Sequence, residues 1–251
     1  MRVLLLRLDA PLLSFGGTVV DAKNVTDDMP SRSMVTGLLG NALGYDHRDS
    51  AHLGRLQERL RLAARRDRAG ERLVDFQTVD LGQDFLEAGW TTWGAKEGRE
   101  GGTAGEGTHI RYRHYLADAV YTLALTLTPA DETPTLDELA AAVDEPARPL
   151  FLGRKACLPS VPLRLAVVET DSLLAALRDA PLPSRRGRAG EARCLVRVPR
   201  GTPLPEGIAF AERAVTEERD WPNQIHVGRS IVLEGFLDCD AATRPSQPRA
   251  T

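Results

Sequence analysis

The sequence of 251 residues contains few cysteines and few aromatic side chains. Its three cysteines, Cys157, Cys194 and Cys239, are widely separated and include no C-x-x-C pair. This number and spacing predict neither a disulfide framework nor a zinc site, and they favour a reducing compartment such as the cytoplasm. We therefore expect no bound metal ion and no cofactor.

The sequence also lacks an apolar run long enough to span a bilayer. The N-terminal stretch VLLLRLDAPLL is interrupted by Arg7 and Asp9, and no small-residue cleavage site typical of a signal peptide follows it. We interpret this stretch as a core strand and expect no membrane partner.

An excess of basic residues is missing as well, because the net charge is -3. Nucleic-acid-binding domains are often basic overall, so the total charge does not indicate one. The arginines are nevertheless clustered: residues 48–72 and residues 185–200 are rich in Arg, and the sequence predicts two basic patches there. Arg greatly outnumbers Lys, which suits bidentate recognition of phosphate, although codon bias would produce the same excess.

Three segments have patterns typical of helices. Ser31 is suited to cap a helix whose apolar residues recur at helical spacing from Met34 to Leu43. A second amphipathic helix is predicted to begin near Ser50. Thr135 and Glu138 form a capping box at the start of the third.

Several other segments have patterns typical of strands, at residues 3–8, 73–79, 121–128 and 163–168. Residues 121–128 alternate cleanly and predict a strand with one buried face. The order of strands and helices predicts an α+β protein with a ferredoxin-like domain over residues 1–170. We expect a small β-rich C-terminal part over residues 171–240 and a disordered tail over residues 241–251.

A Gly-rich segment from Asp80 to His109 separates two of these strands and contains Trp90 and Trp93. It is too long for an ordinary hairpin turn. Tryptophans in such a segment can stack on unpaired bases, each contributing about 1–3 kcal/mol. The alternative is that both pack on the core or on a partner protein.

The stretch PLFLGRKACLP, from Pro149 to Pro159, predicts a loop that approaches a ligand closely. Gly153 permits a close backbone approach, and Arg154 and Lys155 place two cations beside it. An ordinary surface turn would have the same composition.

Four stretches together resemble the Cas-five family, whose CasD-type members are subunits of type I-E CRISPR Cascade surveillance complexes. They are LRLDAPLLSFG, PSRSMVTGLLGNALG, RYRHYLADAVYTLAL and PLFLGRKACLPSVPL, and the resemblance extends over about two-thirds of the chain. It implies a RAMP-type, RRM-like ferredoxin-like domain with a long thumb hairpin, which caps the 5′ handle of the CRISPR RNA in antiviral defence. The implied partners are the CRISPR RNA, a backbone subunit of the CasC type and a large subunit of the CasA type, with target DNA met only through the complex.

The resemblance also implies which residues bind RNA. At the start of the first helix, free backbone N–H groups would favour phosphate. The other contacts would come from the thumb, which the resemblance places as an insertion at about residues 80–112, from the base of the thumb and from the glycine loop. The implied RNA-binding residues are Arg32, Ser33, Trp90, Trp93, Arg111, Arg113, His114, Phe151, Leu152, Gly153, Arg154 and Lys155.

Two other functions remain open from the residues. A metal-independent endoribonuclease, as in type I-C relatives, needs a general base, a general acid and a cation. His114 with Tyr112 or Tyr115, and Lys155 or Lys96, are candidates for these roles, but no spacing requires them to converge. The type I-E resemblance favours a non-catalytic subunit instead. The other possibility is a structural adaptor whose basic patches bind acidic protein surfaces.

Overall fold

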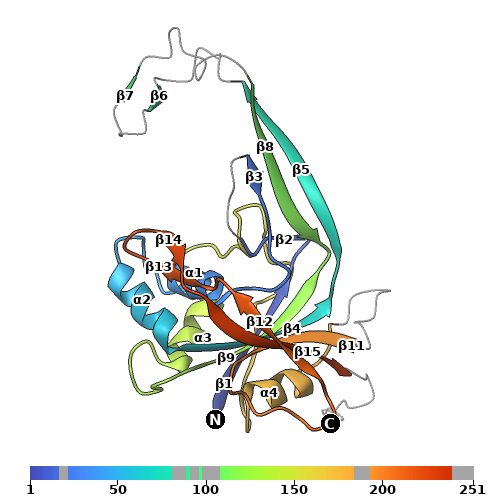
Figure 1. Ribbon diagram of the computed structural model, residues 1–251. Helices are drawn as coiled ribbons and strands as arrows, with labels where there is room; N and C mark the ends of the chain where they lie inside the picture. The colour runs from blue at the N-terminus through green and yellow to red at the C-terminus, as the bar shows by residue number, and fades with distance from the viewer. Residues whose placement is uncertain (17–21, 81–88, 91–95, 98–107, 184–192, 239–251) are drawn as a thin grey trace, which may run out of the picture.

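The computed structural model describes residues 1–16, 22–80, 89–90, 96–97, 108–183 and 193–238. A seven-stranded antiparallel sheet forms its centre, and a long two-stranded arm projects from it (Figure 1). The strand order is β10-β1-β9-β4-β11-β15-β12. The bounds are β1 (Arg2–Asp9), β4 (Leu60–Arg68), β9 (Val120–Leu127), β10 (Arg164–Glu169), β11 (Arg193–Pro199), β12 (Phe210–Val215) and β15 (Ser230–Asp238). The mixed α+β class predicted from the sequence is confirmed.

The two faces of the sheet are covered by different helices. α1 (Arg32–Ala42), α2 (Ser50–Arg59) and α3 (Leu136–Asp144) belong to the side where Leu4 and Leu6 of β1 are buried. α4 (Leu173–Asp179) packs on the opposite face, against Val3 and Leu5. In the described part of the chain, no helix has the length and apolar character needed to cross a membrane.

The predicted helix signals at Ser31 and Thr135 are confirmed. The Ser31 hydroxyl accepts a hydrogen bond from the Met34 N–H, and Thr135 and Glu138 form both halves of a capping box. The prediction of one buried face for residues 121–128 is wrong, because every residue of β9 is buried. The cause is α4, which the sequence analysis did not predict and which covers the second face of β9.

The arm consists of β5 (Glu71–Asp80) and β8 (Thr108–Ala117), which pair with each other along their whole length. In the sequence, the arm is inserted between β4 and β9. Two short strands, β2 (Leu12–Leu13) and β3 (Lys23–Asn24), pair with the other edge of β8. Between the ends of the arm, the described residues include only β6 (Gly89–Trp90) and β7 (Lys96–Glu97). The arm therefore begins before the predicted insertion, at Glu71.

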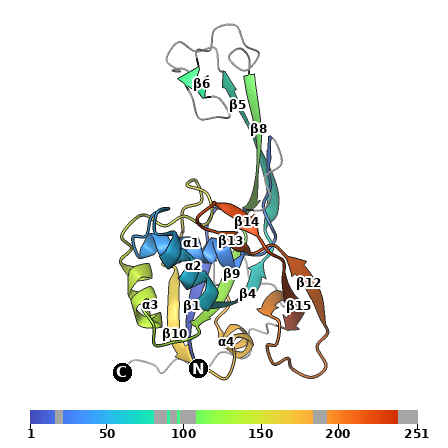
Figure 2. The same ribbon diagram turned by 60° about the vertical axis from the view of Figure 1, so that its left-hand side comes forward.

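Three of the C-terminal strands, β11, β12 and β15, extend the central sheet. β11 pairs with β4, and β15 and β12 follow it. A small hairpin of β13 (Glu218–Asp220) and β14 (Ile225–Val227) lies beside α1 (Figures 1 and 2). The predicted disordered tail over residues 241–251 falls outside the described residues.

The prediction of a basic surface patch over residues 48–72 is wrong for its central arginines. Arg59 and Arg65 are fully buried, and Arg59 donates hydrogen bonds to the carbonyls of Pro129 and Glu132 at 3.0 and 2.6 Å. These partners lie far away in the sequence, so the cluster of arginines looked like a solvated surface.

A buried ionic network around Asp67 holds α4 against the sheet. The Asp67 carboxylate accepts hydrogen bonds from Arg65 Nε and Thr122 Oγ1, both at 2.5 Å, and lies 3.8 Å from Arg7 Nε. Arg65 Nη1 in turn donates to the Ala180 carbonyl, just after α4, at 2.9 Å. Burial lowers the pKa of Arg7, and Asp67 opposes that shift. The carboxylate therefore compensates two buried cations.

We predict that Asp67→Asn lowers the free energy of unfolding by about 3–5 kcal/mol, because it removes the carboxylate that binds the buried Arg65 and leaves the buried Arg7 with only the weaker attraction of Asp9. Thr122→Val removes one neutral donor and is expected to cost only about 1 kcal/mol. Urea denaturation followed by circular dichroism measures both. Equal midpoints for Asp67→Asn and the unchanged protein would contradict the role of the network.

Candidate nucleic-acid interface

The loop at Gly153 is shaped by a close contact with the chain's own backbone. Gly153 has a φ of +105°, and a Cβ atom there would lie 1.6 Å from the Ser14 carbonyl oxygen. The Ser14 N–H also donates to the Leu152 carbonyl at 3.2 Å. No other residue fits without moving the backbone. The close approach seen in the structure is therefore to Ser14 of the same chain, whereas the sequence predicted an approach to a ligand.

Arg154 fixes this loop to the base of the arm. Its Nη1 donates to the His114 carbonyl in β8 at 2.8 Å, and its Nη2 donates to the Asn24 carbonyl in β3 at 2.9 Å. The guanidinium also lies 4.8 Å from the ring centroid of Tyr115. Several donors of Arg154 are thus occupied within the chain. The structure gives this side chain a positioning role that the sequence did not indicate.

The remaining residues of the loop differ in exposure. Lys155 is exposed and forms no ion pair with any residue that the structure describes, whereas Phe151 is half-buried and Leu152 fully buried. The loop is closed by hydrogen bonds of 2.8 Å that join Leu152 to Cys157 and Cys157 to Arg154. Burial raises the pKa of the Cys157 thiol. Lys155 is therefore the cation of this loop that is available to a ligand.

The start of α1 does not offer the free N–H groups that we expected. The Ser33 N–H donates to the Glu217 carbonyl at 2.9 Å, and the Met34 N–H donates to Ser31 Oγ at 3.2 Å. The Arg32 guanidinium forms an ion pair with Glu218 and lies 3.9 Å from Glu217. The segment at the start of β13 thus occupies the Ser33 N–H and the Arg32 guanidinium, and the Ser31 side chain occupies the Met34 N–H.

The three basic residues at the base of the arm lie on two faces. Arg111 and Arg113 of β8 stand opposite Gln77 and Asp75 of β5, on one face of the arm. His114 stands opposite Val74, on the other face. Arg113 is exposed, and His114 is partly buried. The structure therefore does not combine the three into one cluster.

The second face of the arm carries an apolar surface that the sequence analysis missed. We call Val74, Phe76, Ile110 and Tyr112 the apolar face of the arm. Their exposed fractions are 50%, 55%, 38% and 37%, and the rings of Phe76 and Tyr112 lie 5.4 Å apart. Apolar and polar residues alternate in both β5 and β8, and this alternation was the sequence signal for an apolar face. Only the structure shows that this face is exposed. A contiguous exposed apolar patch of this kind marks a contact surface.

The two tryptophans are not placed with the other candidates. Trp90 lies in β6, and its side chain, like the whole of Trp93, falls outside the described residues. Within the described ranges, no group of His, Cys, Asp and Glu side chains is arranged to hold a metal ion.

Comparison with known proteins identifies relatives of the whole chain. A family model described as CRISPR-associated protein (Cas_Cas5) matches residues 3–232. The CRISPR system Cascade subunit CasD of Escherichia coli (strain K12) is 35% identical over 166 residues, which are 66% of this chain and 71% of that protein.

Two solved structures have similar folds. A chain of a CRISPR RNA-guided surveillance complex matches with a TM-score of 0.61 and 26% identity, over 94% of this chain and 89% of that chain. A crystal structure of a Cas protein matches with a TM-score of 0.62 and 26% identity, over 94% and 95% of the two chains. From the span of the family model and the identity to CasD, we conclude that this chain belongs to the Cas5 family of CRISPR-associated proteins.

Proposed function

We propose that this chain is a non-catalytic, CRISPR RNA-binding subunit of a type I-E Cascade surveillance complex, and that it caps the 5′ handle of the guide RNA in antiviral defence. The similarity to CasD and to a chain of an RNA-guided surveillance complex supports this function. Such a subunit would work in the cytoplasm, without a membrane.

The topology of residues 1–170 supports a ferredoxin-like, RAMP-type domain. The strand order β10-β1-β9-β4 has α1 between β1 and β4, and α3 between β9 and β10. This is the connectivity of a split βαβ arrangement. The arm, inserted between β4 and β9, would then be the thumb.

The observation that carries the proposal is the joint between the glycine loop and the arm. Arg154 ties the loop to β3 and β8, while Lys155 beside it and Arg113 on the arm remain exposed. Phe151 adds a half-buried aromatic ring. Single-stranded RNA is bound by cations that contact phosphates and by aromatic rings that stack on bases. The joint therefore offers the groups that hold an unpaired handle.

The apolar face of the arm is better suited to a protein than to solvent. We propose that it packs against a neighbouring backbone subunit of the CasC type, with the handle held between the two. A large subunit of the CasA type would be the other protein neighbour, and target DNA would be reached only through the complex.

The endoribonuclease alternative receives no support from the arrangement of its candidate residues. Tyr115 is buried beneath Arg154 and lies on the opposite face of β8 from His114. Tyr112 shares a face with His114, but its ring contacts Phe76. The general acid and base that cleavage requires are therefore not paired here.

We predict that the double variant Lys155→Glu, Arg113→Glu binds CRISPR RNA at least about tenfold more weakly, because each reversal removes a phosphate contact and adds repulsion. Fluorescence anisotropy with RNA recovered from the purified complex measures the affinity. Arg178→Glu on α4 reverses one charge in the same way at an exposed site away from the arm, and should leave the affinity unchanged. Equal affinity of the double variant would exclude this joint as the RNA contact.

Gly153→Ala should destabilise the fold by more than about 2 kcal/mol, because the new Cβ collides with the Ser14 carbonyl and the positive φ is strained. Thermal denaturation tests this. Gly54→Ala is the matched control, since a Cβ there meets nothing within 4 Å and α2 should become slightly more stable. If Gly153→Ala has the same melting temperature as the Gly54→Ala control, the loop can rearrange to accept the Cβ atom and the prediction is wrong.

Phe76→Asp is expected to prevent incorporation into the complex without unfolding the isolated protein, because this ring is 55% exposed on the apolar face. Val79→Asp is a matched control, because Val79 is 47% exposed on the opposite face of the arm. Co-purification with tagged partner subunits is the measurement. Normal assembly of Phe76→Asp would refute a protein contact at this face.

A further inference from the structure

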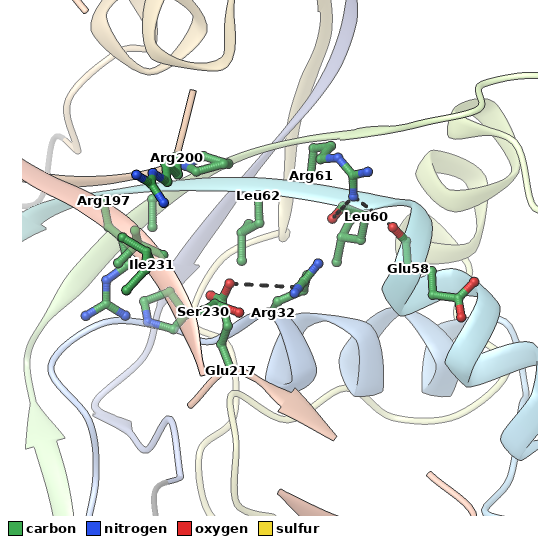
Figure 3. A pocket seen from close by; sticks show the side chains of 14 residues that line it. Arg32, Glu58, Leu60, Arg61, Leu62, Arg197, Arg200, Glu217, Ser230 and Ile231 are labelled. Atoms are coloured by element: carbon green, nitrogen blue, oxygen red, sulfur yellow. Dashed lines mark hydrogen bonds and ion pairs between the residues drawn. The ribbon is translucent and has the colours of Figure 1, made fainter. Parts of the chain in front are cut away.

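A cleft opens in the sheet where β4 and β11 separate. These strands pair only between Ala64–Arg66 and Leu195–Arg197. Before Ala64, β4 continues beside β9 alone, while β11 stays paired with β15 as far as Pro199. The separation leaves a cleft of about 450 Å³, which we call the β4–β11 cleft (Figure 3). This volume is large enough for one nucleotide.

The inner walls of the cleft are apolar. Leu62 and Ile231 are only half-buried, and their side chains line the opening from β4 and β15. Leu60, Ala64 and Val232 complete these walls. A planar, weakly polar group such as a nucleobase gains by leaving water between surfaces of this kind.

Two arginines at the cleft have donors available to a ligand. Arg61 uses Nη1 for the carbonyls of Glu58 and Leu60, at 2.7 and 3.4 Å, and forms no ion pair within the described part of the chain. Arg200 is 68% exposed, and its ion pair with Glu212 at 3.5 Å is weak because both side chains are solvated. Arg197, by contrast, is held by Glu234 at 2.6 Å. Arg61 and Arg200 are therefore each suited to contact a phosphate.

A fixed carboxylate lies across the cleft from these arginines (Figure 3). The side chain of Glu217 is 15% exposed, and its main chain is held by the Ser33 N–H. Burial raises the pKa of Glu217, and Arg32 opposes that shift from 3.9 Å. Carboxylates accept hydrogen bonds from the exocyclic amino groups of bases. The cleft thus presents a carboxylate acceptor, held in place by Arg32 and Ser230, and two arginines in its lining.

We propose that the β4–β11 cleft binds one extruded nucleotide of single-stranded RNA, with its phosphate on Arg61 and Arg200, its base between the apolar walls, and the base amino group donating to Glu217. This site rests on the proposed RNA-binding function and adds base selectivity to it. Adenine and cytosine carry an amino group and are accepted. Uracil has carbonyl oxygens in the corresponding positions, which the carboxylate repels.

The test compares short oligo(A), oligo(C) and oligo(U) RNA by fluorescence anisotropy with the purified full chain. We expect oligo(A) and oligo(C) to bind about tenfold more tightly than oligo(U), because one well-placed hydrogen-bonding contact to a base gives discrimination of about this size. Glu217→Gln keeps the shape but lets an amide donate to the uracil carbonyls, so the preference should fall to within about twofold. Arg61→Ala and Arg200→Ala should weaken binding to all three RNAs by about three- to tenfold. Both side chains are at the surface, so these variants should fold.

Arg55→Ala, which removes an exposed arginine from α2, is the matched control and should change nothing. If Lys155→Glu weakens binding while Arg61→Ala, Arg200→Ala and Glu217→Gln leave affinity and base preference unchanged, the cleft is not a nucleotide site and the proposed function stands. If the unchanged protein binds none of the RNAs and brings down no RNA from the complex, the proposed function itself fails, and the cleft proposal fails with it.

Discussion

The joint between the arm and the sheet depends on the contact between the backbones of Gly153 and Ser14. Because no side chain separates them, the loop lies close enough for Arg154 to reach carbonyls in both β3 and β8. Arg154 also covers Tyr115, which is buried at the end of the arm. A long two-stranded arm has little core of its own, so its direction must be fixed at this end. Gly153 therefore helps to position the candidate interface, although its own close contact is with Ser14 inside the chain.

Some arginines of this chain form hydrogen bonds within the fold, whereas others remain available to a ligand. This division explains how a chain of net charge -3 can bind RNA. Arg59, Arg65 and Arg154 donate mainly to main-chain carbonyls within the fold. Buried guanidinium groups serve this purpose well because they present several donors in a fixed plane. Other cations, among them Lys155 and Arg61, are at the surface, and they stand where the fold places them. Local geometry, rather than total charge, therefore determines where a polyanion is held.

Much of the local structure could be predicted from the sequence, because it depends on neighbouring residues. Ser31 capped α1 and Thr135 capped α3 as expected, since both caps act within one turn. Predictions failed where the partner is distant. β9 is buried on both faces because α4 crosses it, and Arg65 is buried where its guanidinium donates to the carbonyl of Ala180, far away in the sequence. The Ser33 N–H at the start of α1 is not free for the same reason, since the Glu217 carbonyl that accepts from it comes from another region of the chain.

The segment from Thr26 to Arg32 links the loop at the arm with the β4–β11 cleft. Thr26 Oγ1 accepts a hydrogen bond from the Phe15 N–H at 2.9 Å, next to the Ser14 that Gly153 contacts. The Asp28 carbonyl accepts one from Tyr121 Oη at 2.7 Å, which fixes the middle of the segment to β9. Arg32 then lines the cleft. With both ends and the middle fixed, the spacing between the two sites is set by the fold. A single strand of RNA held at both must therefore match that spacing, so the fold itself would select the register in which the strand is bound.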